Sequence, residues 1–210
     1  MTKRVIKIIK LLQEAYPDAG PMLKFSSRFE LLVAVVLSAQ STDEQVNRVT
    51  AQLFKVFKTP ADFATMDINE LEAHIKGVGL YKNKAKNIKN LSIILLEKYA
   101  GEVPGDFDSL IDLPGVGRKS ANVVLSVAFN LPGLGVDTHV QRVSNRIGIV
   151  SEKTPDKTEI ALKAVIPREL WSQSHHLLIF HGRQVCKARK PDCQHCCIEA
   201  DCQKEIESKA

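Results

Sequence analysis

The chain contains 210 residues, 44% of them hydrophobic and 25% charged, with 29 Lys and Arg residues against 24 Asp and Glu. This length allows one large domain or two small ones, and the composition is that of an ordinary soluble globular protein. The formal charge of +5 is mildly basic, so it permits nucleic acid as a partner without indicating one. The longest apolar run, residues 31–37, is too short to cross a bilayer, so we expect no membrane contact and a cytoplasmic location.

The first twelve residues begin with basic side chains and continue with apolar ones, as a signal peptide does. Lys7 and Lys10 interrupt the apolar run, however. The segment therefore reads as an amphipathic helix and not as a signal peptide.

Helical periodicity continues along the chain and predicts an all-α fold. The predicted helices lie near residues 2–15, 28–39, 43–57, 68–76, 82–99, 107–112, 117–130, 138–147, 156–165 and 169–182. The valine-rich residues 31–37 would also suit a buried strand, but the chain offers no second segment of comparable quality to pair with them. Residues 131–136, with one proline and two glycines, are the best candidate for a crossing between domains.

Two predicted corners between helices share the tripeptide Gly-Val-Gly, at residues 77–79 and 115–117. In each case lysine, alanine and asparagine follow in the same order on the next helix. Glycine lets a backbone turn tightly and come close to a ligand, and the first amides of a helix favour an anion such as phosphate. Two such corners would suit the repeating phosphates of a nucleic acid, although so short a match also arises by chance between ordinary helical corners.

All five cysteines fall between positions 186 and 202, which excludes a disulfide framework distributed over the chain. Cys186, Cys193, Cys196 and Cys202 are separated by six, two and five residues. Zinc sites usually pair two short Cys-x-x-Cys elements, whereas this compact single-loop spacing favours an iron–sulfur cluster over zinc. His195 and Cys197 stay open as alternative ligands.

Between the first two of these cysteines lie Lys187, Arg189 and Lys190. A loop pinned by metal ligands at both ends would hold these cations ready for phosphate. A solvated charged loop is the equally weighted alternative.

Several segments together resemble one family. They are Leu113-Pro-Gly-Val-Gly-Arg-Lys-Ser-Ala, Val136-Asp-Thr-His-Val, Leu37-Ser-Ala-Gln-Ser-Thr-Asp, Gly79-Leu-Tyr-Lys-Asn-Lys-Ala, His181-Gly-Arg and the cysteine pattern. In this order and over nearly the whole chain, they resemble endonuclease III, of the helix–hairpin–helix superfamily of base-excision DNA glycosylases.

The resemblance implies a bilobal all-α fold. Residues 21–131 would form a six-helix barrel domain with the helix–hairpin–helix motif, and residues 1–20 with 132–210 would form a domain with a [4Fe-4S] cluster on the four cysteines. It implies a DNA glycosylase and AP lyase that removes oxidised pyrimidines from double-stranded DNA, as a monomer associated with the nucleoid when acting on DNA.

The resemblance places the nucleophile at Lys119 and a carboxylate at Asp137. An amine must be neutral to attack a sugar carbon, and both Arg118 and the positive end of a helix favour the neutral form of Lys119. Asp137 would stabilise positive charge on the sugar, and it is also well placed to cap the helix that follows. Without the resemblance, simple phosphate binding by Lys119 would be the better interpretation.

The resemblance and the local chemistry together predict the contacts with DNA. Gln40 and Leu80 match positions that wedge into the duplex where the base has left. The amides of the glycine corner would hold a phosphate, and further cations would add a salt-dependent grip. The predicted DNA-binding residues are Gln40, Leu80, Lys82, Lys84, Gly115, Gly117, Arg118, Lys187, Arg189 and Lys190.

Three alternatives bear on the function. The adenine-mismatch glycosylases resemble this architecture but carry a catalytic glutamate on the helix that here has no acidic residue between positions 31 and 37, and they lack the lysine. A pyrimidine-dimer glycosylase would show the same catalytic motif and stays open. A non-catalytic DNA-binding module with zinc would have the basic corners without needing both Lys119 and Asp137.

Overall fold

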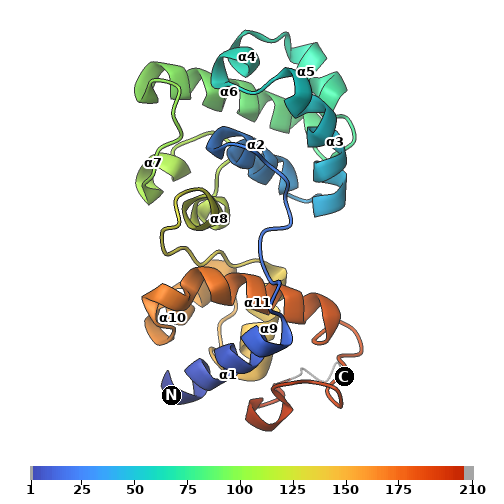
Figure 1. Cartoon of the computed structure of the whole chain (residues 1–210), viewed down its shortest axis with the longest axis vertical. Coiled ribbons are helices and arrows are strands. Elements are labelled where there is room, and N and C mark those ends of the chain that lie inside the picture. Colours follow the sequence, from blue (N-terminus) through green and yellow to red (C-terminus); the bar gives the residue numbers. More distant parts are fainter. Residues whose placement is uncertain (1, 206–210) are drawn as a thin grey trace. The chain divides into compact units, whose positions relative to one another are not determined.

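The computed structural model describes residues 2–205, and the regular structure within that range is entirely helical (Figure 1). The helices are α1 (Thr2–Ala15), α2 (Arg28–Ser38), α3 (Asp43–Val56), α4 (Pro60–Thr65), α5 (Ile68–Ile75), α6 (Tyr81–Tyr99), α7 (Phe107–Ile111), α8 (Arg118–Ala128), α9 (Thr138–Ile147), α10 (Pro155–Val165) and α11 (Trp171–Gln184), with the 3-10 turns η1 (Arg168–Leu170) and η2 (Glu199–Asp201). The prediction of an all-α fold is confirmed. Over the described range, each helix is too short or too polar to cross a bilayer.

The chain divides into two compact units, each with its own hydrophobic core. One is continuous, from Pro21 to Leu131, and contains α2–α8. The other joins the residues up to Gly20 with those from Pro132 onward, and contains α1 and α9–α11.

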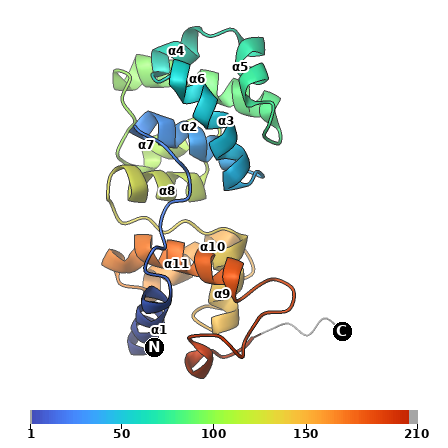
Figure 2. The same cartoon turned by 45° about the vertical axis from the view of Figure 1, so that its right-hand side comes forward.

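The continuous unit is built around α2, whose residues 29–37 are all buried. Helices α3, α6 and α8 pack against it, so α2 lies among the other helices of its unit (Figure 2). A helix covered on all sides has no need of a polar face, which explains its unbroken apolar run. The strand alternative for residues 31–37 is therefore wrong, since this segment is the central helix.

The second unit brings the two ends of the sequence together. Helix α11 packs against both α1 and α9. The Arg4 side chain on α1 donates hydrogen bonds to the carbonyl oxygens of Gly148 and Asp201, at 3.0 Å each. These bonds satisfy carbonyls at the end of α9 and in the turn η2, directly before Cys202, so α1 is an integral part of this unit.

Helix α4 was not among the predicted helices. Its six residues give too little periodicity to register, but its start carries a clear signal. Thr59 and Asp62 form a capping box, and Pro60 occupies the first turn. The fully buried Phe63 then fixes the short helix in the core.

Candidate catalytic site and nucleic-acid interface

The corner between α7 and α8 is anchored from below by two apolar side chains. Leu113 and Val116 are buried in the core of the continuous unit. Between them Gly115 has φ +82°, and a Cβ there would lie 2.9 Å from Nδ2 of Asn87. Both the backbone conformation and the tight packing therefore require glycine at this position.

Gly117 at the same corner has no such requirement. Its φ is −94°, which any residue adopts, and a Cβ built on it would meet no heavy atom within 4 Å. It occupies the N-cap of α8, where glycine offers no side chain to cover the first amides of the helix. This side of the corner is therefore open to solvent and has room for a ligand beside Gly117.

Arg118 and Lys119 form the first turn of α8 and are exposed. The buried residues of this helix include Ala121, Val124 and Leu125, so the exposed turn lies away from the core face. The Arg118 guanidinium lies 5.0 Å from the centre of the Phe107 ring on α7, which ties the two helices of the hairpin together. The Lys119 amine is thus presented to solvent, two residues beyond the open Gly117.

The second glycine corner, between α5 and α6, carries Leu80, which is 57% exposed. Gln40, in the turn after α2, is also exposed. Both residues have φ +54°, in the left-handed region that non-glycine residues seldom occupy. Lys82 on the first turn of α6 is exposed as well, as a phosphate contact requires.

Lys84 lies differently from what a phosphate contact requires. Its side chain is buried, with 4% of the residue exposed. Its Nζ donates to the carbonyl oxygen of Leu37 at 2.8 Å and to Oγ of Ser41 at 3.0 Å. Burial lowers the pKa of this amine. Our expectation that Lys84 reaches DNA directly is therefore corrected: it faces the protein, because the end of α2 offers it carbonyl and hydroxyl acceptors.

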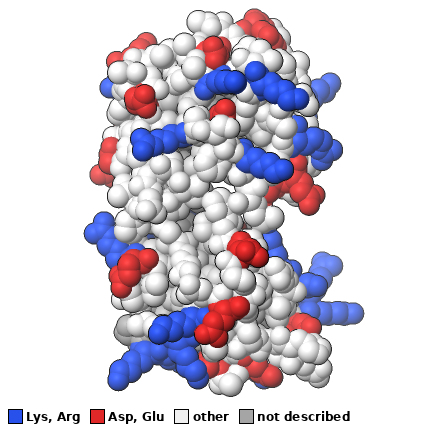
Figure 3. All heavy atoms as spheres, in the orientation of Figure 1, with Lys and Arg blue, Asp and Glu red and all other residues white. Residues whose placement is uncertain are grey.

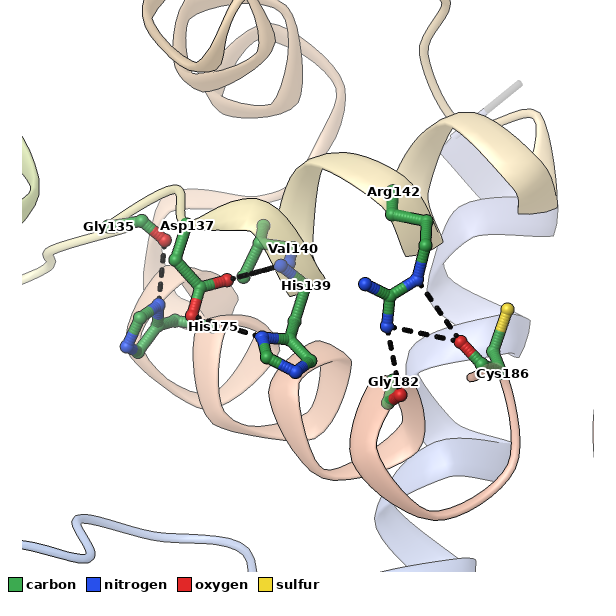
Figure 4. A network of polar contacts seen from close by, with 8 residues as sticks. All are labelled: Gly135, Asp137, His139, Val140, Arg142, His175, Gly182 and Cys186. Carbon is green, nitrogen blue, oxygen red and sulfur yellow. Dashed lines mark hydrogen bonds and ion pairs between the residues drawn. The ribbon is translucent and has the colours of Figure 1, made fainter. Parts of the chain in front are cut away.

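Asp137 caps α9, as predicted from its place before Thr138 (Figure 4). Its Oδ1 accepts from the backbone N–H groups of His139 and Val140, at 2.9 and 2.8 Å. Its side chain is 20% exposed. The helix N-terminus thus holds a carboxylate in a fixed orientation with part of its surface open.

The ring of His139 lies beside that carboxylate, with Nδ1 at 3.6 Å from Oδ2 of Asp137. Burial lowers the pKa of His139, although the Asp137 charge opposes this shift. The ring is therefore mainly neutral at pH 7. Arg142, one turn further along α9, donates to the carbonyl oxygen of Gly182 at 2.9 Å and fixes α9 against α11.

Four cysteines, Cys186, Cys193, Cys196 and Cys202, line one pocket of about 340 Å³, counted with its open mouth. Their surroundings suit sulfur ligands: Nη1 of Arg146 lies 3.8 Å from Sγ of Cys186, and the Lys204 N–H donates to Sγ of Cys202 at 3.3 Å. Among residues 2–205, no group of three or more His, Cys, Asp or Glu side chains is placed to hold a single metal ion. The fifth thiol, Cys197, is exposed and is not among the residues that line the pocket.

A partly buried tyrosine and a buried histidine form a pair beside the same pocket. The Tyr16 hydroxyl lies 2.9 Å from Nδ1 of His181, and Nε2 of His181 lies 3.7 Å from Sγ of Cys196. Burial lowers the pKa of His181 to about 4 and raises that of Tyr16 to about 12, so the ring is neutral and the phenol is protonated. A neutral ring has one donor and one acceptor nitrogen, which allows Tyr16 to donate to Nδ1 and Nε2–H to face the sulfur.

The loop with Lys187, Arg189 and Lys190 is held from behind. Arg146 on α9 donates to the carbonyl oxygens of Lys187 and Ala188, at 2.7 and 3.0 Å. The three cations of the loop are exposed. The backbone is thus fixed while the charges face solvent, which is the arrangement that the prediction of a phosphate-binding loop requires.

Basic and acidic side chains are interspersed on the face drawn in Figure 3. The net charge alone therefore does not mark a binding surface on that face. The corners and the cysteine loop are distinguished by how their cations are held.

Three supporting residues were not predicted. Ser41, Arg146 and Tyr16 act through hydrogen bonds to residues far away in the sequence, and local periodicity carries no signal for them.

Comparison with known proteins places this chain in a family. The model of the HhH-GPD superfamily of base excision DNA repair proteins matches residues 33–168. Endonuclease III of Bacillus subtilis is 49% identical over 201 residues, covering 95% of this chain and 92% of its own, and that of Escherichia coli K12 is 48% identical over 198 residues, covering 94% of each. A solved structure of a trapped endonuclease III–DNA covalent intermediate superposes with a TM-score of 0.92 at 46% identity, covering 97% of this chain and 96% of its own.

The chain therefore belongs to the HhH-GPD superfamily of base excision DNA repair proteins. Within it, the chain is a member of the endonuclease III family, and thus an enzyme, a DNA glycosylase/AP lyase.

Proposed function

We propose that this enzyme removes oxidised pyrimidines from double-stranded DNA through a Schiff base on Lys119, and then cleaves the strand 3′ to the abasic site by β-elimination. The observation that carries the proposal is the exposed Lys119 amine on the first turn of α8, beside the open corner at Gly117. The similar endonuclease III was trapped as a covalent intermediate with DNA, which agrees with covalent chemistry in this chain.

In the proposed reaction the neutral Lys119 amine attacks C1′ of the damaged nucleotide. The new C1′–N bond replaces the glycosidic bond, and the base leaves with the bonding electrons and takes up a proton. The nitrogen loses a proton and forms a C1′=N bond as the C1′–O4′ bond breaks, so the sugar ring opens and O4′ takes up a proton. The resulting protonated imine acidifies the 2′ proton. Its removal drives the electron pair into the C2′–C3′ bond, so the C3′–O bond breaks and the 3′ phosphate leaves.

We propose that Asp137 supplies the carboxylate for this chemistry. Positive charge develops on the sugar as the base departs, and a fixed carboxylate stabilises it without having to reorient. The two N–H bonds from the start of α9 support this part, because they hold the carboxylate in a fixed orientation while 20% of the side chain is exposed. The carboxylate would also accept and return protons around the imine.

DNA would be held at several points. The amides around Gly115 and Gly117 would bind one phosphate, while Gln40 and Leu80 would fill the space that the extruded base leaves. Lys82, Arg118, Lys187, Arg189 and Lys190 would add contacts whose strength falls with salt. We propose that the enzyme acts as a monomer, in the cytoplasm on nucleoid DNA.

We propose that Cys186, Cys193, Cys196 and Cys202 hold a [4Fe-4S] cluster. Four sulfurs share one pocket, and their compact spacing in a single loop favours a cluster over zinc. The bound cluster would supply a cross-link between the cysteine loop and the core of its unit.

The proposal is tested by borohydride trapping on a duplex with one thymine glycol. We expect a covalent adduct with the parent enzyme and none with Lys119→Ala. Lys98→Ala serves as the matched control, because Lys98 is an exposed lysine in the last turn of α6.

Four other outcomes would contradict parts of the proposal. Base release without any adduct in the parent would mean a monofunctional glycosylase. An adduct that persists in Lys119→Ala would place the nucleophile elsewhere. Activity on a pyrimidine dimer but not on thymine glycol would assign the other lesion class, and an inactive parent that still binds DNA would favour a non-catalytic module.

A further inference from the structure

Two exposed turns of the continuous unit share a strained backbone conformation. Gln40 and Leu80 each have φ +54°. Non-glycine residues avoid this region and persist there only where the surrounding structure holds them. The question is therefore what holds these two turns.

One hydroxyl connects them. Ser41, next to Gln40, accepts a hydrogen bond at its Oγ from the N–H of Gly79, next to Leu80, at 3.2 Å. The same Oγ accepts from Nζ of Lys84 at 3.0 Å. These two donors fill both acceptor positions of the Ser41 hydroxyl oxygen. The Ser41 side chain therefore joins the two turns.

The turns also touch through their backbones. A Cβ on Gly79 would lie 3.3 Å from the carbonyl oxygen of Gln40. Glycine thus permits a close approach that a larger residue would push apart. The two exposed side chains, on Gln40 and Leu80, are therefore presented by a single packed junction.

Lys84 closes this junction from the protein side. Besides Ser41, its Nζ donates to the carbonyl oxygen of Leu37 at 2.8 Å, in the last turn of α2. Carbonyl groups in the last turn of a helix lack partners within the helix and favour a cation. Lys84, on the first turn of α6, thus joins that turn to the end of α2 and to the turn that follows it.

We propose that Ser41 and Lys84 are positioning residues for base extrusion. This inference rests on the proposed function, in which Gln40 and Leu80 enter the duplex. Their junction holds both turns in the inserting conformation before DNA binds. The turns therefore lose no further conformational entropy when the base leaves the stack. Without the junction the turns relax, and extrusion slows although Lys119 is intact.

The experiment compares two substrates. The first is a duplex with one thymine glycol flanked by 2-aminopurine, whose fluorescence follows disruption of the stack in stopped flow. The second is a single strand with an abasic site, which requires no extrusion and is scored by borohydride trapping. Ser41→Ala and Lys84→Met are measured on both, below the melting temperature of each variant.

Ser41→Ala removes both hydrogen bonds to the Ser41 hydroxyl, and we expect it to slow the fluorescence change by at least about tenfold, the equivalent of about 1.4 kcal/mol for one hydrogen bond. Lys84→Met should slow it to a similar extent, because it also removes two bonds. Trapping on the single strand should stay at the parent rate in both. Ser41→Thr, which keeps the hydroxyl, should restore extrusion, and Lys98→Met controls for the loss of one positive charge.

Gln40→Ala and Leu80→Ala separate this inference from the function on which it rests. If neither slows extrusion, the proposed insertion of these side chains into the duplex fails. If they slow it but Ser41→Ala and Lys84→Met extrude at the parent rate, the positioning role is overturned. Equal slowing on both substrates would also overturn it, since that indicates general damage to the fold.

Discussion

The two glycines of the α7–α8 corner predict opposite phenotypes. Gly115→Ala should damage the fold, because φ is +82° and the new methyl meets Asn87 at 2.9 Å and Val36 at 3.2 Å. Gly117→Ala should leave the fold intact, because φ is −94° and the methyl enters open space. If the open side is where a phosphate approaches, the second change should instead weaken DNA binding.

The sizes of the two effects follow from these contacts. A left-handed backbone costs alanine about 1–2 kcal/mol. Displacing packed neighbours adds about 1–3 kcal/mol. Gly115→Ala should thus lose about 2–5 kcal/mol of folding free energy, and its melting midpoint should fall by at least about 4 °C for a chain of this size. Gly117→Ala should stay within about 1 kcal/mol of the parent.

Thermal melting and fluorescence anisotropy on a duplex with an abasic site measure the two properties separately. We expect Gly117→Ala to bind at least about tenfold more weakly, the loss of one amide–phosphate hydrogen bond. If Gly117→Ala melts as low as Gly115→Ala and binds DNA like the parent, then no phosphate approaches the backbone at Gly117 and the prediction is refuted.

Three further predictions concern the other unit. Asp137→Ala removes the cap of α9 and should lose about 1 kcal/mol of stability, whereas Asp137→Asn should keep the cap. Both variants should lose strand cleavage. A fully active Asp137→Asn variant would exclude a role for the carboxylate charge. Cys196→Ser should lower the iron content and the melting midpoint, while the exposed Cys197→Ser should change neither, and equal losses in both would reject the ligand set. Burial lowers the pKa of His176 in the folded protein, so the unfolded chain takes up a proton on this ring at higher pH than the folded one does, and the free energy of unfolding should fall as pH drops below about 6.5. His176→Gln should weaken this pH dependence of stability in urea titrations. An unchanged pH dependence in that variant would contradict the lowered pKa.

Sequence periodicity predicted those helices whose apolar faces repeat over several turns. It recovered α9 with its cap, because Asp137 lies directly before the amphipathic residues 138–147. It missed α4, where six residues cover less than two turns. The prediction there would have needed the capping box at Thr59 instead of periodicity.

A candidate site could be proposed from the sequence where the residue type alone suggests the chemistry, as with Lys119 and the cysteines, whose roles stay predictions. It was not predictable where position in space decides the role. Lys82 and Lys84 look alike in the sequence, yet the first is exposed and the second is buried against the end of α2. Only the packing of α6 on α2 separates them, because a shift of two residues turns a helical side chain to the opposite face.

The hydrogen bonds of Arg4 set an order of events for the growing chain. Its acceptors include Asp201, so α1 makes this contact only after residues up to 201 have been synthesised. Residues 21–131 form a unit of their own, so this unit can pack before the later residues have been synthesised. During synthesis the apolar face of α1, with Val5, Ile8 and Leu12, stays uncovered, and a helix of this length is barely stable alone. A chain stalled before Cys193 would therefore carry one folded unit and an exposed apolar face on α1. Such incomplete chains would be prone to aggregation or degradation.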